Sequence, residues 1–407
     1  MKPSSKIIFL IFFLAGAGCE NKSSGPTAPG GDFATLPLFL KQWGGTGSGD
    51  GQFGQLGGLT LDAAGNLYAC DSDHNRVEKF DSNGHFLLKW GTVGSAAGQF
   101  NDPMGIATWG TSIYVVDSGN NRVQVFDGVG NYLSGWGSAG SGEGEFTDPW
   151  GIAVNSAGEV YVVDRGNNRV QKFTADGSVT QVWGGGGSGN GKFNSPTDIV
   201  VDSTGNVVVA DTLNNRVQRF SSTGSFQAAW GSYGDAPGQF RSPLGLAFDQ
   251  LGNLYVADSA NGRIQKFDGS GSYVSQWGGF GSDLGKFQLP GKVAIAGSAP
   301  LFFVGDQGTN RIQKFGPPSA YRFFPNPVMP GDELTISFNS VSFIGYQVQI
   351  LDSMNKLVYS HEGQAIAGNN QVQWDVKSDG SRVPHGVYQV NFTLGSTPVT
   401  QKIAVVD

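Results

Sequence analysis

A ten-residue motif occurs six times in this chain and restricts its possible folds more than any other feature. The copy at 117–126 reads DSGNNRVQVF, and in every copy an arginine follows the first aspartate by five positions. One spacing repeated six times indicates a turn between two strands, held by an ion pair or by arginine binding backbone carbonyls, and not a single catalytic site. The repeated pairs are Asp71 and Arg76, Asp117 and Arg122, Asp164 and Arg169, Asp211 and Arg216, Asp258 and Arg263, and Asp306 and Arg311.

A second motif, Trp-Gly, alternates with the first, and both recur every 46 to 48 residues. Each period contains four apolar runs of strand length, for example 105–108, 112–117, 121–127 and 131–137. Glycine- and asparagine-rich links between the runs are typical of hairpin turns. Four antiparallel strands in a period of this length predict one blade of a β-propeller. We expect the Trp residues of the outermost strands to pack between blades and not to form a sugar-binding platform; they are Trp43, Trp90, Trp136, Trp183, Trp230 and Trp277.

The order of the two motifs predicts how the ring closes. The series begins with a Trp-Gly strand at 37–44 and ends with an Asn-Arg strand at 310–315. Every earlier motif arginine is followed 14 residues later by Trp, whereas the residue 14 positions after Arg311 is Pro325. The sixth blade therefore lacks its own outer strand. Because an open array would expose unpaired edges, we expect 37–44 to complete the blade formed by 291–315.

These residues resemble the NHL repeat family of six-bladed propellers, whose pattern includes GIAV, as at 151–154, and DxxNxRVQ, as at 164–171. The resemblance covers about 37–316 and implies an all-β, six-bladed NHL β-propeller, to which we assign 36–318. A fold of this kind implies little about function by itself.

Composition fits this interpretation. Glycine accounts for 64 of 407 residues and charged residues for 14%, as expected for short strands joined by tight turns. The net charge of −7 argues against a nucleic-acid partner, because such surfaces are basic. The two cysteines, Cys19 and Cys70, cannot form a disulfide framework.

The N-terminus predicts export. Two lysines precede the apolar run 7–15, which is too short to span a membrane, so we assign 1–18 to an export signal peptide. LAGAGC (14–19) resembles a bacterial lipobox, which would lipidate Cys19, although Gly16 departs from the pattern; the alternative is ordinary cleavage after Ala17. We favour lipidation, because 19–35 then serves as a flexible linker. The expected location is the bacterial membrane, as an anchored lipoprotein, or the cell surface.

After 318 the period stops, and 319–407 contains short alternating runs that predict a small antiparallel sandwich. FPNPVMPGDELTISF (324–338) and WDVKSDGSRVPHGVYQV (374–390) resemble C-terminal Ig-like modules of bacterial surface proteins, including those of hook-capping proteins and the type IX secretion sorting domain. A glycine usually follows Trp-Asp in these modules, whereas this chain has Val376. The resemblance leaves two roles open, a sorting signal and a structural or adhesive stalk.

Known chemistries of six-bladed propellers find little support in these residues. Converging histidines for a zinc site are missing from the repeats, which contain only His74 and His85, both in the first blade. A channel calcium site needs several carboxylates, and among the six inner strands only Asp198 supplies one. Cys70 aligns with Val116 and its equivalents, which indicates a small core residue. We therefore assign no catalytic residue, metal or cofactor.

Functional positions are expected where one copy of the repeat differs from the others. Met104 and Trp150 follow the repeat's proline in adjacent blades and could form an exposed contact patch. Asp198 and Lys292 replace a glycine, and Arg165 replaces the usual Ser or Thr after the motif aspartate. We predict that these five residues form a ligand-binding rim, with ordinary variation among repeats as the alternative explanation.

The favoured hypothesis is an envelope-anchored, monomeric scaffold that binds a protein, peptide or glycan on one propeller face. One alternative is a hydrolase or lyase that uses Asp198 and Lys292 in the channel. The other is a purely structural envelope protein.

Overall fold

The computed structural model describes residues 36–297, 300–316, 321–324, 333–340, 344–365, 368–378, 381–394 and 397–405. The predicted signal peptide, the predicted lipidation site Cys19 and the linker lie outside these residues. Within them, regular structure is almost entirely β-strand, and no helix is long and apolar enough to cross a membrane.

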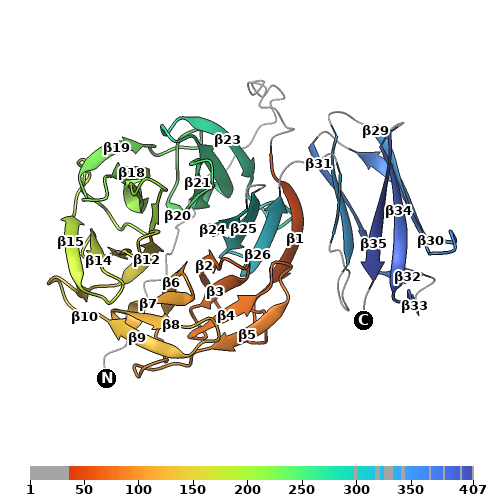
Figure 1. The fold of residues 1–407 in the computed structure, drawn as a ribbon. Coiled ribbons are helices and arrows are strands. Elements are labelled where there is room, and N and C mark those ends of the chain that lie inside the picture. Colours follow the sequence, from red (N-terminus) through yellow and green to blue (C-terminus); the bar gives the residue numbers. More distant parts are fainter. Residues whose placement is uncertain are drawn as a thin grey trace, which may run out of the picture. The chain divides into compact units, whose positions relative to one another are not determined.

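Six four-stranded antiparallel sheets form the blades of a propeller, and each inner strand contacts the inner strands of the two neighbouring blades (Figure 1). The strands, from the channel outward, are as follows. Blade I has β2 (Leu56–Leu61), β3 (Leu67–Asp71), β4 (Arg76–Phe80) and β5 (Phe86–Trp90); blade II has β6 (Pro103–Trp109), β7 (Ser112–Asp117), β8 (Arg122–Phe126) and β9 (Tyr132–Trp136); blade III has β12 (Pro149–Val154), β13 (Val160–Asp164), β14 (Arg169–Phe173) and β15 (Val179–Gly184). Blade IV has β16 (Asp198–Val201), β17 (Val207–Asp211), β18 (Arg216–Phe220) and β19 (Phe226–Trp230); blade V has β20 (Pro243–Phe248), β21 (Leu254–Asp258), β22 (Arg263–Phe267) and β23 (Tyr273–Gly278); blade VI has β24 (Pro290–Ala296), β25 (Leu301–Asp306), β26 (Arg311–Gly316) and β1 (Leu38–Gly44). The predicted six-bladed architecture is confirmed.

The strand that closes the ring comes from the start of the propeller sequence, as predicted. β1 pairs antiparallel with β26, from Leu38 opposite Gly316 to Gly44 opposite Arg311. Phe39 is buried and packs edge-on against Phe315, with ring centroids 5.8 Å apart. Blade VI therefore joins two segments that are far apart in the sequence.

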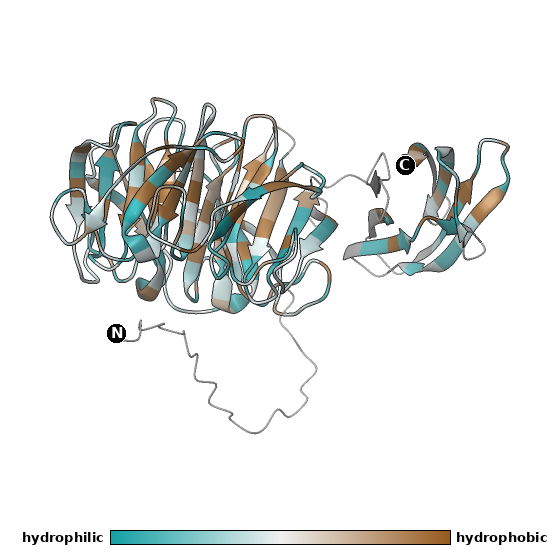
Figure 2. Cartoon of the chain, turned by 90° about the horizontal axis from the view of Figure 1, so that it is seen from below, coloured by the Kyte–Doolittle hydropathy of each residue, from teal (hydrophilic) through white to brown (hydrophobic). Residues whose placement is uncertain are grey.

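Strand position within a blade explains the hydrophobic pattern of each strand. The second strands β3, β13, β17 and β21 are buried along their whole length, because neighbouring blades cover both of their faces. The outer strands β5 and β19 alternate between half-buried and exposed residues. Figure 2 shows hydrophobic residues concentrated on the strands of the blades.

The Trp residues of the outer strands pack between blades. Trp90 of blade I lies 5.8 Å from Phe126 of blade II and 6.1 Å from Tyr68 of its own blade, measured between ring centroids. Trp136 and Trp183 repeat this contact with an aromatic ring of the following blade. These positions are structural, as the sequence indicated.

Between the blades, the loops contain small repeated elements. Three 3-10 turns follow the motif aspartate, η2 (Ser118–Asn120), η3 (Thr212–Asn214) and η4 (Ser259–Asn261), and one loop contains the short parallel pair β10 (Ser138–Ala139) and β11 (Glu145–Phe146).

The C-terminal region forms two sheets that share one apolar core. One sheet has the order β27 (Tyr321–Phe324), β28 (Leu334–Ser340), β31 (Gly368–Trp374), and the other has β30 (Leu357–Ala365), β29 (Ile344–Leu351), β34 (Gly386–Leu394), β35 (Thr397–Val405); a small hairpin pairs β32 (Lys377–Ser378) with β33 (Ser381–Arg382). Trp374 and Ile336 from one sheet and Val348 and Phe392 from the other belong to the same core cluster.

The backbone conformation of Val376 explains why glycine is usual at this position. Its backbone φ of 60° lies in the left-handed region, which glycine adopts without steric cost and a β-branched residue rarely adopts. The Val376 side chain is buried in the shared core, so its burial offsets the backbone strain.

Deleting 36–44 should open the ring. Loss of buried Phe39 and Leu40 alone removes roughly 3–6 kcal/mol of apolar burial, and the edge of β26 becomes unpaired. We expect a large fall in the thermal unfolding midpoint, measured by circular dichroism. A variant lacking only 1–35 keeps β1 and serves as the control. Equal midpoints for the two truncations would contradict closure by β1.

Candidate functional site

The motif aspartate and arginine form a clamp that fixes two loops to each other. The buried Asp117 carboxylate accepts a hydrogen bond from Arg122 Nε at 2.7 Å and another from the backbone N–H of Asn101 at 2.7 Å. The guanidinium of Arg122 also donates to the carbonyls of Ser95, Ala96 and Gln99 at 2.7–2.9 Å. Both expected roles, ion pair and carbonyl binding, are therefore present.

The same ion pair occurs in all six blades. The distance from arginine Nε to aspartate Oδ2 is 2.9 Å in blade I, 2.7 Å in blades II to V and 3.5 Å in blade VI. Because the carbonyls belong to the loop that arrives from the preceding blade, the clamp links neighbouring blades. It is a structural unit and not a ligand site.

Blade I contains a variant of this clamp. Glu78 occupies the position of Gln124, which in blade II donates to Gln99 O at 2.7 Å and accepts from Gly98 N at 2.9 Å. Glu78 accepts from Gly51 N at 2.9 Å and lies 2.5 Å from the guanidinium of Arg76. Burial raises the pKa of Glu78 to about 7, although Arg76 acts in the opposite direction.

The remaining reactive groups of blade I have structural environments. Cys70 is fully buried, and burial raises the pKa of its thiol to about 12, so the reactive thiolate is disfavoured. His74 Nδ1 lies 2.8 Å from the buried motif carboxylate of Asp71. In the described part of the chain, no group of three or more His, Cys, Asp or Glu residues could hold a metal ion.

Two of the predicted rim residues come together in blade III. The guanidinium of Arg165 stacks on the indole ring of Trp150, 4.1 Å from its centroid. Arg165 also donates to Asp148 Oδ2 at 2.9 Å and to Ser195 Oγ of blade IV at 2.8 Å. We call Trp150, Arg165 and Asp148 the blade III patch.

Asp148 is a member that the sequence analysis missed. It also accepts a hydrogen bond from Trp150 Nε1 at 3.2 Å, and partial burial raises the pKa of its carboxyl. Its backbone has φ of 50°, a conformation shared by Asp102, Ser195 and Ser242 at equivalent positions. Aspartate and asparagine tolerate this left-handed conformation better than most residues. A polar residue at 148 is therefore expected from the backbone alone, and nothing in the sequence indicated that Asp148 contacts Arg165.

Met104 does not form the exposed patch with Trp150 that the sequence suggested. Its side chain is 5% exposed, and its sulfur lies 3.3 Å from Ser72 Oγ of blade I. Met104 lies with Trp150, Thr197 and Leu244 around a cavity of about 10 Å³ at the end of the channel. That volume leaves room for about one water molecule, so these side chains narrow this end of the channel.

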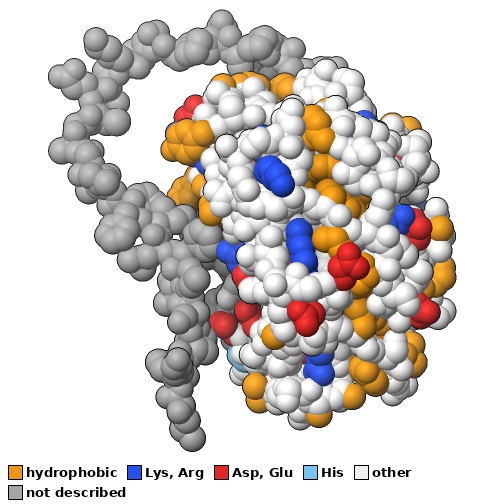
Figure 3. Space-filling model, turned by 90° about the vertical axis from the view of Figure 1, so that its left-hand side faces the viewer, with side chains coloured by type: hydrophobic (Ala, Val, Ile, Leu, Met, Phe, Trp, Pro, Cys, Tyr) orange, Lys and Arg blue, Asp and Glu red, His pale blue; other side chains and the backbone are white. Residues whose placement is uncertain are grey.

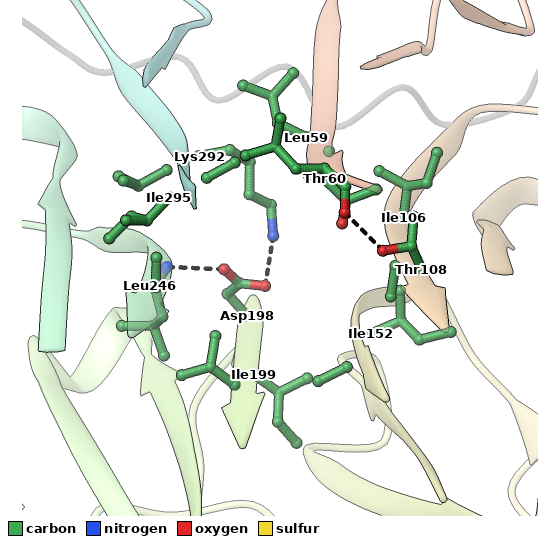
Figure 4. A pocket seen from close by; sticks show the side chains of 18 of the residues that line it. Leu59, Thr60, Ile106, Thr108, Ile152, Asp198, Ile199, Leu246, Lys292 and Ile295 are labelled. Atoms are coloured by element: carbon green, nitrogen blue, oxygen red, sulfur yellow. Dashed lines mark hydrogen bonds and ion pairs between the residues drawn. The ribbon is translucent and has the colours of Figure 1, made fainter. Parts of the chain in front are cut away.

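Asp198 and Lys292 meet inside the channel. Lys292 Nζ of blade VI lies 2.5 Å from Asp198 Oδ1 of blade IV, and Asp198 Oδ2 accepts from the backbone N–H of Leu246 in blade V at 2.8 Å (Figure 4). The predicted rim therefore divides into two separate places, the blade III patch and this channel ion pair.

The equivalent positions explain why this pair is unusual. The other four blades have Gly58, Gly105, Gly151 and Gly245, where an added Cβ would lie 2.1–2.8 Å from the backbone of the next blade. Glycine is therefore required for close packing of blades around the channel. Only blades IV and VI depart from it, and their two side chains carry opposite charges.

Family comparisons agree with this architecture. The NHL repeat model matches residues 100–126, 146–173, 193–220 and 240–267, and the secretion system C-terminal sorting domain model matches 322–406. The chain is an NHL-repeat propeller with a C-terminal secretion sorting domain.

The chain is also similar to several solved structures. A protein of unknown function from Bacteroides thetaiotaomicron is 18% identical, with a TM-score of 0.54, covering 69% of this chain and 76% of its own. A streptogramin B lyase is 14% identical (TM-score 0.49; 91% and 99% covered), and a chain of a nidogen/laminin complex is 16% identical (TM-score 0.44; 54% and 79% covered). No curated protein matches. At these identities the first likeness concerns the fold alone.

Glu78→Gln should stabilise the propeller in a pH-dependent way. The folded-state pKa of about 7 exceeds the ordinary value of 4.5, so ionising Glu78 costs folding free energy as pH rises from about 4.5 to about 7. Gln removes this cost. We expect a gain of about 1–3 kcal/mol in unfolding free energy at pH 8 and little change at pH 4, measured by urea denaturation.

Gln124→Glu provides the matched control in blade II. It should lose stability at pH 8 and little at pH 4, because a carboxylate would then face buried Asp117. A loss of stability at pH 8 in Glu78→Gln would show that the Arg76 ion pair outweighs the cost of burial.

Proposed function

We propose that this NHL propeller is exported to the cell surface and binds a protein, peptide or glycan through the blade III patch. The match of 322–406 to a secretion sorting domain supports export. On this proposal the C-terminal module is a sorting signal and the propeller is the part that recognises a ligand. Lipidation of Cys19 stays a prediction, which mass spectrometry of the mature N-terminus tests.

The observation that supports this binding site is a lost inter-blade bond. In four blades the residue after the motif aspartate donates its hydroxyl to the carbonyl of the proline that opens the next blade, at 2.5–2.8 Å. These bonds join Ser72 to Pro103, Ser118 to Pro149, Thr212 to Pro243, and Ser259 to Pro290. Blade III has Arg165 at this position, whose side chain contacts Trp150, Asp148 and Ser195. A stabilising contact is thus replaced by a pre-formed cluster of aromatic and charged groups.

The chemistry of the patch suits recognition. A guanidinium over an indole ring contributes roughly 0.5–2 kcal/mol, so the stack is ordered before a ligand arrives. Ordered side chains lose little conformational entropy on binding. The half-buried indole offers apolar surface beside fixed charges, a combination enriched where proteins contact partners.

The outer surface supplies no competing charged patch on the side drawn in Figure 3. Lys, Arg, Asp and Glu side chains are spread there among hydrophobic and other uncharged ones, and no large area of one sign is visible. This agrees with the low charged fraction of 14% and gives no support to nucleic-acid binding.

Arg165→Ser combined with Trp150→Ala tests the patch. Serine restores the hydroxyl residue found in blades I, II, IV and V, so we expect the thermal midpoint to stay within a few degrees of wild type. Partner binding from envelope extract, quantified by pull-down and mass spectrometry, should fall at least about tenfold, the loss expected for a central aromatic and arginine pair.

Tyr233→Ala with Arg241→Ala is the matched control, because it removes another arginine–aromatic contact, 5.3 Å from guanidinium to ring centroid, on a different blade. This control should keep the partners. Partners unchanged in the Trp150 and Arg165 variant would overturn the assignment and favour a purely structural protein.

A further inference from the structure

The channel contains a cavity of about 290 Å³ that is separate from the blade III patch. The inner strands of all six blades line it, and the aliphatic residues among them, such as Leu59, Ile106, Ile152 and Ile199, are almost completely buried between the blades. Figure 4 shows these side chains around the space, with Lys292 and Asp198 pointing toward one another across it. The volume is at the lower end for small-molecule sites and suits a ligand about the size of one sugar ring.

Of the two charged groups in this cavity, Asp198 is firmly fixed and Lys292 is not. Asp198 is held from two sides, by Leu246 N and by Lys292, and is 5% exposed. Among the residues that the structure describes, Lys292 Nζ makes one hydrogen bond, to Asp198 Oδ1 at 2.5 Å. An ammonium group has three N–H donors, so two remain available to a ligand, and the carboxylate retains acceptor positions.

Packing of the ring does not account for this pair. The glycine at the same position in the other four blades allows the blades to approach closely. A partly buried ion pair gives weak net stability, because desolvation of both charges opposes their attraction. A charged pair formed by the two blades in which the repeat departs from glycine therefore indicates recognition.

The charges also restrict the class of ligand. A carboxylate can accept both remaining donors of Lys292, whereas hydroxyls can donate to Asp198. An amino group would be attracted to Asp198 but repelled by the adjacent Lys292 ammonium. A neutral sugar could accept from the remaining Lys292 donors only through hydroxyl oxygens, which form weaker hydrogen bonds with an ammonium group than a carboxylate does.

We propose that the channel binds a small hydroxycarboxylate, with its carboxylate on Lys292 and its hydroxyl groups on Asp198. Met104 and Trp150 narrow the end beside the pair to a space of about 10 Å³, which is too small for such a ligand, so the ligand enters from the other end of the inner strands, where Leu61, Thr108 and Val154 line the cavity. The charged pair includes no residue of the blade III patch, although Trp150 of that patch lies at the channel end beside Lys292.

Isothermal titration calorimetry of the full chain with glucuronate and gluconate tests this site. We expect at least one of them to bind at least about tenfold more tightly than glucose, which lacks the carboxylate, and glucosamine, which carries an amine. Lys292→Met should abolish this binding. Lys286→Met, which removes an exposed lysine of the loop preceding blade VI, should leave it unchanged.

The double variant Lys292→Met with Asp198→Asn covers the case in which a single change leaves a buried charge and unfolds the chain. It should keep the fold, checked by circular dichroism, and should not bind. Arg165→Ser alone, which removes the patch arginine and keeps Trp150 at the channel end, should bind the hydroxycarboxylate as wild type does, which distinguishes failure of this site from failure of the proposed function. No binding of either acid to wild type, or tighter binding of glucosamine, would overturn the proposal.

Discussion

The bond network of the motif aspartate supports every other feature of the propeller. A fully buried carboxylate is costly unless its acceptor positions are filled, and Asp117 receives donors from Asn101, Asn120, Arg122 and Gln124. These donors come from two loops that join different strands, so satisfying one charge fixes both loops. Arginine carries the link across to the loop of the preceding blade. Repeated six times, this network makes the ring of blades a structure in which each blade positions the next.

This arrangement determines where variation can occur without loss of the fold. Replacing the motif aspartate or the motif arginine would leave its partner as an unpaired buried charge. The residue directly after the aspartate contributes only one hydroxyl bond to the next blade. Blade III has replaced that hydroxyl with Arg165, and the clamp of Asp164 and Arg169 beside it keeps its 2.7 Å geometry. The channel position tolerates only glycine wherever blade backbones approach closely. Asp198 and Lys292 are accommodated at two places in the ring where each provides the counter-charge for the other.

The fold could be predicted from the sequence because the motifs that define the blades recur at a nearly constant spacing. Six copies of Asp-to-Arg spacing identify the blades, and the missing Trp after Arg311 identifies β1 as the closing strand. The candidate site could be predicted only in part, because its residues are single exceptions. Arg165 and Trp150 were found as departures from the repeat, but Met104 was placed on the surface although it is buried against Ser72. Asp148 was missed because its left-handed backbone already explains a polar residue there. Asp198 and Lys292 were predicted to act together in the channel only under the enzyme alternative, and their direct contact depends on ring geometry that no local pattern contains.

The blade III patch and the Asp198–Lys292 pair lie at neighbouring places in one ring of blades. Trp150 belongs to the blade III patch and also lines the channel end beside Lys292, so a ligand in the channel and a partner on the patch would lie close to a common side chain. Effects of substitutions usually add only at separate sites without common partners. Ser195 is a second connection, because it belongs to blade IV, as Asp198 does, and accepts a hydrogen bond from Arg165. Coupling between channel and patch would therefore pass through Trp150 or through the short segment from Ser195 to Asp198.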